Sequence, residues 1–138
     1  MITLLSPTKT QSIQIVKNDL SRSEPLEFEK ANYLISLLRK LTTDDLSQLM
    51  KTSRAIAART KDAIDAWGKD TTQSIYLFQG DAFQKLDATS LNQDELLFSQ
   101  NHLIILSALY GYLRPFDSVA AYRLDMKDPI AIPDYRNL

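Results

Sequence analysis

The spacing of apolar residues along this 138-residue chain predicts alternating strands and helices. Short apolar runs bounded by turn residues predict strands at 1–5, 74–78, 103–106 and 122–126. Apolar residues at helical spacing predict a helix over 25–41, a helical turn at 83–86, and a helix over 92–101 with Leu96 and Leu97 on its apolar side. This order predicts a single α/β domain over 1–138, with a mixed or mainly parallel sheet and flanking helices.

Residues 42–67 keep one apolar helical face that includes Trp67, for which a place in the core is sufficient explanation. Thr42 and Asp45 have the spacing of a capping box, so a helix is expected to begin there. Two alternatives remain for its length. One long helix could continue to Trp67, or two helices could meet near Thr52–Ser53, because both residues are weak helix formers. Gly68 is suited to ending the last turn.

Composition excludes several classes of protein. No apolar run is long enough to span a membrane, and the first residues lack a secretory layout, so a cytoplasmic location without membrane association is expected. The chain has no cysteine and one histidine, which argues against zinc, iron–sulfur and thiol chemistry. Three glycines are too few for the common dinucleotide and phosphate loops. No cofactor and no metal site are therefore expected.

Charge is unevenly distributed although the net charge is only -1. Residues 30–61 contain seven basic and two acidic residues, and the rest of the chain contains nine basic and fifteen acidic residues. A basic block in an acidic chain is typical of a nucleic-acid footprint, and equally of an ordinary solvated helix face. The candidate contacts to nucleic acid are Arg39, Lys40, Lys51, Arg54, Arg59 and Lys61.

Polar residues that follow the predicted strands form a second candidate site, which we call the rim. In an open α/β sheet such residues gather at the carboxyl ends of strands. The rim candidates are Ser6, Lys9, Asp81, Tyr110, Arg114, Tyr122 and Arg123. The alternatives are structural: Arg114 could pair with Asp117 to brace a loop, Asp81 could cap a helix, and Lys9 could form a salt bridge. The lone His102 is more typical of a hydrogen-bonded structural residue than of a catalyst.

The spacing Ser6-x-x-Lys9 matches the nucleophile motif of serine β-lactamases. In those enzymes the serine opens a helix, whereas here Pro7 and Thr8 follow a strand, and the chain has neither S-D-N nor K-T-G. An anion-binding or salt-bridging role for Lys9 agrees better with the sequence.

Four ordered segments resemble one known family. They are SPTKT at 6–10, FQGDAFQKLDA at 78–88, HLIILSALYGYLRPFD at 102–117 and YRLDM at 122–126. Together they closely resemble the bacterial YaaA family of peroxide-stress proteins. Thr8 and Ala108 depart from the family, which favours alanine and glycine there. Family members are about twice as long, so the chain resembles their amino-terminal half, as a fragment or a naturally short member.

The resemblance implies a cytosolic protein that limits free iron during hydrogen peroxide stress and binds DNA through a helix-hairpin-helix-like element and a positively charged cleft. The sequence supports side-chain phosphate contacts by the basic block. Helix-hairpin-helix elements usually use glycine, however, and no glycine precedes Gly68. Without thiolates or paired-glutamate helix patterns, the chain is expected to affect iron only indirectly and to bind it no more tightly than a generic acidic surface.

Three functions follow as hypotheses. The first is a YaaA-like stress protein that binds DNA non-specifically through its basic helices. The second is an enzyme of unknown reaction that acts on an anionic small molecule at the rim, chiefly through Lys9, Asp81, Arg114 and Arg123. The third is an interaction module without chemistry. An unpaired sheet edge left by the shorter chain, around 122–126, also predicts a homodimer.

Overall fold

The computed structural model describes residues 1–8, 10–13 and 20–122. A three-stranded sheet contains β1 (Thr3–Leu5), β3 (Leu103–Ser107) and β4 (Gly111–Leu113) in the order β1-β3-β4. β1 and β3 are parallel, and β3 and β4 are antiparallel. A second, two-stranded sheet pairs β2 (Thr72–Gln73) with β5 (Ser118–Val119). The expected α/β class with a mixed sheet is confirmed.

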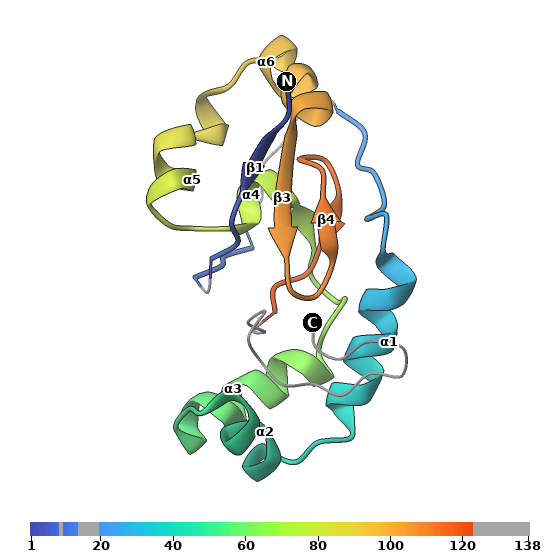
Figure 1. Ribbon diagram of the computed structural model, residues 1–138, viewed down its shortest axis with the longest axis vertical. Coiled ribbons are helices and arrows are strands. Elements are labelled where there is room, and N and C mark those ends of the chain that lie inside the picture. The colour runs from blue at the N-terminus through green and yellow to red at the C-terminus, as the bar shows by residue number, and fades with distance from the viewer. Residues whose placement is uncertain (9, 14–19, 123–138) are drawn as a thin grey trace.

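Three helices occupy the end of the molecule opposite the N-terminus (Figure 1). They are α1 (Phe28–Arg39), α2 (Thr43–Met50) and α3 (Arg54–Asp65). The capping box is confirmed, because the Thr42 side chain accepts from the Asp45 N–H and the Asp45 side chain accepts from the Thr42 N–H. The structure also decides between one helix and two: α2 ends before Lys51, and Ser53 caps α3.

The remaining helices lie at the other end and behind the sheet (Figure 1). They are α4 (Ser74–Leu77), α5 (Asp81–Leu86), the 3₁₀ turn η1 (Ala88–Ser90) and α6 (Gln93–His102). Asn92 and Glu95 form a second capping box at the start of α6. Leu96 of this helix is buried, but Leu97 is exposed, so the expectation that both lie on the apolar side is wrong for Leu97.

The predicted strand at 74–78 is wrong, since residues 74–77 form the helical turn α4. All four are buried, so the segment has no polar face whose period could distinguish a strand from a helix. The helical conformation is set instead by hydrogen bonds to the 114–117 loop. The Ser74 N–H donates to the Asp117 carbonyl at 2.9 Å, the Ile75 N–H donates to the Pro115 carbonyl at 3.1 Å, and the Ser74 hydroxyl donates to the Arg114 carbonyl at 2.5 Å. Of the strand predicted at 122–126, only Tyr122 lies within the described residues.

The main core lies between α1, α3, α4 and the inner face of the three-stranded sheet. It contains Leu34, Leu38, Ile64, Ile105 and Leu113, each at most 4% exposed. A smaller cluster joins α4 and α6 through Ile75 and Leu96. Trp67 is partly buried against the main core, where its ring stacks on Phe28 with centroids 6.1 Å apart.

Candidate functional site

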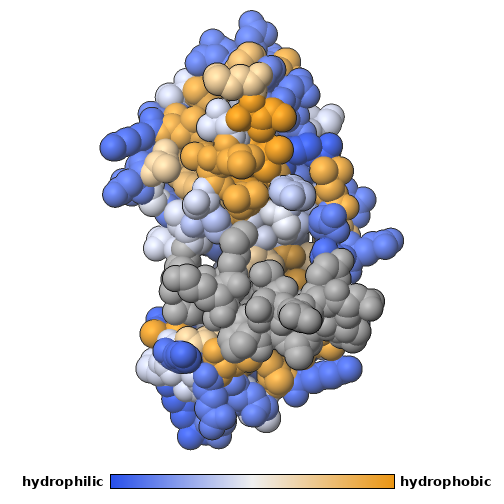
Figure 2. Space-filling view, in the orientation of Figure 1, coloured by the Kyte–Doolittle hydropathy of each residue, from blue (hydrophilic) through white to orange (hydrophobic). Residues whose placement is uncertain are grey.

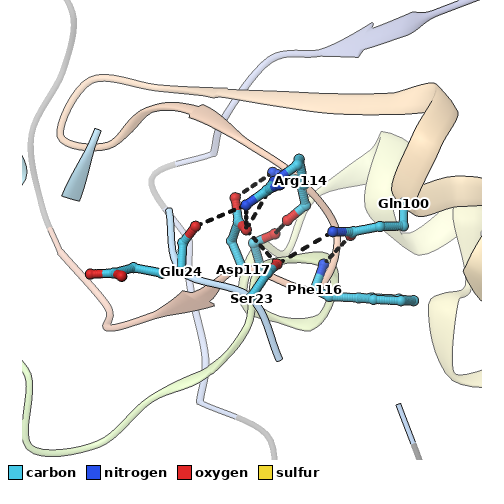
Figure 3. A network of polar contacts seen from close by, with 7 residues as sticks. Ser23, Glu24, Gln100, Arg114, Phe116 and Asp117 are labelled. Carbon is cyan, nitrogen blue, oxygen red and sulfur yellow. Dashed lines mark hydrogen bonds and ion pairs between the residues drawn. The ribbon is translucent and has the colours of Figure 1, made fainter. Parts of the chain in front are cut away.

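Arg114 lies in a closed network of polar contacts around the fully buried carboxylate of Asp117 (Figure 3). The Arg114 Nε and Nη2 atoms donate to Asp117 Oδ1 at 3.2 and 3.1 Å, and the Arg114 backbone N–H donates to Oδ2 at 2.8 Å. The Ser23 hydroxyl also donates to Oδ1 at 2.6 Å. A buried carboxylate is tolerated only when its charge is paired and its oxygens accept hydrogen bonds, and all of these conditions are met.

The same network ties together segments that are distant in the sequence (Figure 3). Arg114 Nη2 donates to the Glu24 carbonyl at 2.9 Å. Gln100 donates to the Ser23 hydroxyl at 3.3 Å and accepts from the Phe116 N–H at 2.8 Å. The guanidinium therefore holds the 114–118 loop to Glu24, and Gln100 joins the same loop and Ser23 to α6. This geometry matches the structural alternative for Arg114.

Of the rim candidates, the structure places Tyr110 and Tyr122 side by side. Their rings meet edge to face with centroids 5.8 Å apart, and both side chains are buried. The Tyr110 hydroxyl accepts from the Ala120 N–H at 2.9 Å, and the hydroxyls of Tyr122 and Ser107 are 2.6 Å apart. Burial raises the pKa of Tyr110 to about 12, and burial likewise raises the pKa of Tyr122. Both phenols stay neutral and serve as hydrogen-bonding core residues.

The other rim residues divide between the surface and the part of the chain outside the described residues. Ser6 and Asp81 are exposed, and Asp81 is the first residue of α5, after Gly80 as its N-cap. The segments that carry them are neighbours, because a Cβ on Gly80 would lie 2.8 Å from Thr8 Cγ2. Lys9 and Arg123 lie outside the described residues, so their convergence with the rim stays a prediction.

The direction of β4 explains why Arg114 has its partners elsewhere. β1 and β3 are parallel, so Leu5 and Ile105 are register partners and their carboxyl ends lie at the same edge. β4 runs back along β3, with Gly111 opposite Ser107 and Leu113 opposite Ile105. Its carboxyl end, where Arg114 follows, therefore points away from the edge where β1 and β3 end. The sequence pattern treats every strand end alike and does not reveal this reversal.

Two cavities flank these groups. One, of about 370 Å³, is lined by the rings of Phe28, Trp67 and Tyr110 and by Arg22, whose Nη1 donates to Thr71 Oγ1 at 3.0 Å. The other, of about 340 Å³, lies between α3 and Tyr122 and includes Gln11 and Arg59. Sequence reasoning missed Arg22 and Gln11. Gln11 Oε1 accepts from the Tyr122 N–H at 2.8 Å, a contact between residues 111 positions apart that no local pattern announces.

The basic block runs from α1 through α2 into α3, and α2 and α3 pack on each other as a helical hairpin. The turn between them begins at Lys51, which adopts a left-handed conformation with φ 50° and ψ 51°. This conformation normally favours glycine, and here a lysine adopts it. The Ser53 side chain accepts from the Ile56 N–H, while the N–H groups of Arg54 and Ala55 have no acceptor among the described residues.

The six predicted nucleic-acid contacts fall into two groups. Lys61 and Arg39 join α1 to α3, because Lys61 Nζ donates to the Arg39 carbonyl at 2.6 Å and Arg39 Nε donates to the Ile64 carbonyl at 3.3 Å. Lys61 also pairs with Asp65 at 3.5 Å. Arg39 is nevertheless exposed, as are the other four residues: Lys40, Lys51, Arg54 and Arg59. Of these, only Arg54 has a carboxylate partner among the described residues, Asp44 at 3.3 Å.

The described part of the chain contains no group of three or more His, Asp or Glu side chains that could hold a metal ion. His102 is half-buried, stacks on Phe98 with ring centroids 3.9 Å apart, and its Nδ1 lies 2.8 Å from the Phe98 carbonyl oxygen. Among those residues, none of the helices has the length and apolar character needed to cross a bilayer.

Comparison with known proteins agrees with the four motifs. The family model described as peroxide stress protein YaaA matches residues 1–138. A UPF0246 protein of Clostridium botulinum is 33% identical over 141 residues, covering all of this chain and 55% of the relative. UPF0246 proteins of Clostridium perfringens and Bordetella avium are 36% identical and are covered to 56%. The chain therefore spans about half the length of these curated relatives, and it belongs to the YaaA family of peroxide stress proteins.

Proposed function

We propose that this chain serves the peroxide-stress response in the cytoplasm by binding DNA non-specifically through the α2–α3 hairpin. The observation that carries the proposal is the turn at 51–53 together with the start of α3. This region combines the exposed cations Lys51 and Arg54 with the backbone N–H groups of Arg54 and Ala55, which have no acceptor among the described residues. Helix N-termini bind phosphate oxygens through such groups, and lysine and arginine neutralise phosphate charge.

The interface proposed here is smaller than the basic block of the sequence. It consists of Lys40, Lys51, Arg54 and Arg59, which present exposed charges just after α1, in the turn and on α3. Arg54 forms an exposed ion pair with Asp44, and such pairs are weak enough to open when a phosphate competes. Lys61 and Arg39 are assigned to holding α3 against α1, so they support the interface without contacting DNA.

An effect on intracellular iron follows indirectly in this proposal. The described residues offer no cluster of metal-binding side chains, so the chain is not proposed to store or chelate iron. In this proposal the hairpin coats DNA, and DNA is the molecule that iron-driven oxidation damages. An enzymatic role at the rim is not favoured, because Arg114 is engaged with Asp117 and the Glu24 carbonyl.

The test compares two triple variants with the same change in net charge. In the first, Lys51, Arg54 and Arg59 become alanine. In the second, Arg22, Lys69 and Lys85 become alanine, which removes three exposed cations outside the hairpin. Binding of a short duplex is titrated across a series of salt concentrations. We expect the first variant to flatten the slope of log affinity against log salt by about 2 to 3, since each phosphate contact contributes roughly 0.9.

The control variant is expected to retain the parent slope to within about one contact. Equal weakening by the two variants would mean that net charge, rather than the hairpin, attracts DNA. Absence of duplex binding by the parent chain at low salt would reject the proposal for this part of the protein.

A further inference from the structure

One face of the three-stranded sheet is apolar and open to solvent. Leu4 of β1 is the register partner of Ile104, and Leu106 is the register partner of Tyr112 on β4. Register partners lie on the same face, and alternate residues of a strand share a face. These four residues therefore form one surface, the outer face. The intervening residues, such as Ile105 and Leu113, point into the core and are fully buried.

The outer face consists of large apolar side chains of the kind that are normally buried. Leu4 is 59% exposed and Tyr112 is 56% exposed, while Ile104 and Leu106 between them are half-buried. Ile2, two residues before Leu4, is 61% exposed. Figure 2 shows the corresponding hydrophobic patch on the side where the sheet faces the viewer in Figure 1. A patch of this kind marks an interaction surface.

The amino-acid sequence of β3 is stronger evidence that the outer face is covered than the exposed fractions are. A sheet with one solvated face alternates apolar and polar residues, whereas strands buried on both faces are apolar throughout. Residues 103–106 are Leu-Ile-Ile-Leu, so β3 has the sequence of a strand with layers on both sides. The inner face is covered by the core, but the described residues provide no second layer over the outer face.

The length of the relatives indicates what covers it. The whole of this chain matches 55–56% of the Clostridium and Bordetella proteins, so more than two-fifths of each relative lies outside the matched region. We infer that the outer face, centred on Leu4, Ile104, Leu106 and Tyr112, docks a polypeptide homologous to that remaining part of the relatives. The inference is independent of DNA binding, because the hairpin lies elsewhere in the fold.

The absence of cysteine from the chain makes a sharp test available. A Tyr112→Cys variant places a unique thiol on the outer face, and Leu26→Cys places one at a 66% exposed position outside the sheet. Each is prepared as the 138-residue chain and as a continuous fusion to a cysteine-free version of the remaining part of the Clostridium perfringens relative. The rate of thiol modification by a maleimide is then measured in all four proteins, after circular dichroism has established that each is folded.

We expect the thiol of Tyr112→Cys to react at least tenfold more slowly in the fusion than in the 138-residue chain, and the thiol of Leu26→Cys to react equally fast in both. Equal rates at position 112 would overturn the inference. Protection in the 138-residue chain that grows with its own concentration would also overturn it, by identifying a second copy as the occupant. If the fusion does not fold, the same measurement at the aligned position of the full-length relative decides the question.

Discussion

Both Arg114 Nε and Arg114 Nη2 donate to a single oxygen, Oδ1, of a fully buried Asp117. Loss of the arginine leaves this carboxylate buried without its charge partner. We therefore expect Arg114→Ala to lower the free energy of unfolding by about 3 kcal/mol in urea titrations. Arg54→Ala, which removes the exposed pair with Asp44, should cost less than about 1 kcal/mol. If the Arg114→Ala variant is as stable as the parent, the guanidinium is not needed for folding and a functional role at the rim would be favoured instead.

The buried phenols predict a loss of stability in alkaline solution. Burial raises the pKa of Tyr110 to about 12, above the value near 10 of an unfolded tyrosine, so the unfolded chain loses this proton first. The stabilisation is complete below pH 10 and is lost as the pH rises from about 10 to about 12. Chemical denaturation across this range should show a decline that is shallower in Tyr110→Phe. A parallel decline in that variant would assign the pH dependence to other groups.

Lys51 allows folding and DNA binding to be separated. Its left-handed conformation is unfavourable for a residue with a Cβ, so Lys51→Gly should stabilise the hairpin by about 0.5 to 1 kcal/mol in thermal unfolding. The same change removes one cation from the proposed interface and should flatten the salt slope of DNA binding by about 0.9. A protein that is both more stable and a weaker binder is the expected result. Unchanged binding would remove Lys51 from the interface.

The close approach of Gly80 and Thr8 predicts a strained alanine variant. Gly80 has φ +150°, and a Cβ there would lie 2.8 Å from Thr8 Cγ2. Gly80→Ala should lower stability by roughly 1 to 3 kcal/mol, because the substitution combines a clash with an unfavourable backbone conformation. Adding Thr8→Ser removes the clashing methyl group and should recover part of this loss in urea titrations. No recovery would show that backbone strain alone accounts for the effect.

The parts of the fold that were predicted correctly depend on neighbouring residues in the sequence. The Thr42–Asp45 box begins α2, and the apolar spacing of α1 and α3 places Leu34, Leu38 and Ile64 in the core. Apolar runs likewise predicted β1 and β3. Capping bonds and amphipathic faces form within a few residues of each other, so one sequence contains the information that they require.

Other features are decided by contacts across the chain. Residues 74–77 are buried on every side, so the 114–117 loop rather than any periodicity makes them helical. The three-residue strand β4 and the two-residue strands β2 and β5 are too short to show a period of two, and all three were missed. Strand direction also decides where Arg114 lies. Because β4 is antiparallel to β3, Arg114 lies away from the edge where β1 and β3 end, and it contacts Asp117 and the Glu24 carbonyl instead.

The sequence by itself determined the family, the helical character of residues 42–67 and the positions of the basic residues, because motif order and local spacing are properties of neighbouring positions. The break of this segment into α2 and α3 was decided by the structure. Only the tertiary structure decided which of those charges are free. Lys61 and Arg39 donate to carbonyl groups more than twenty residues away, while the exposed side chains of Lys51 and Arg59 have no such acceptor among the described residues. The physical reason is that the partner of a charge is set by which segments pack together, and packing joins residues that the sequence keeps apart.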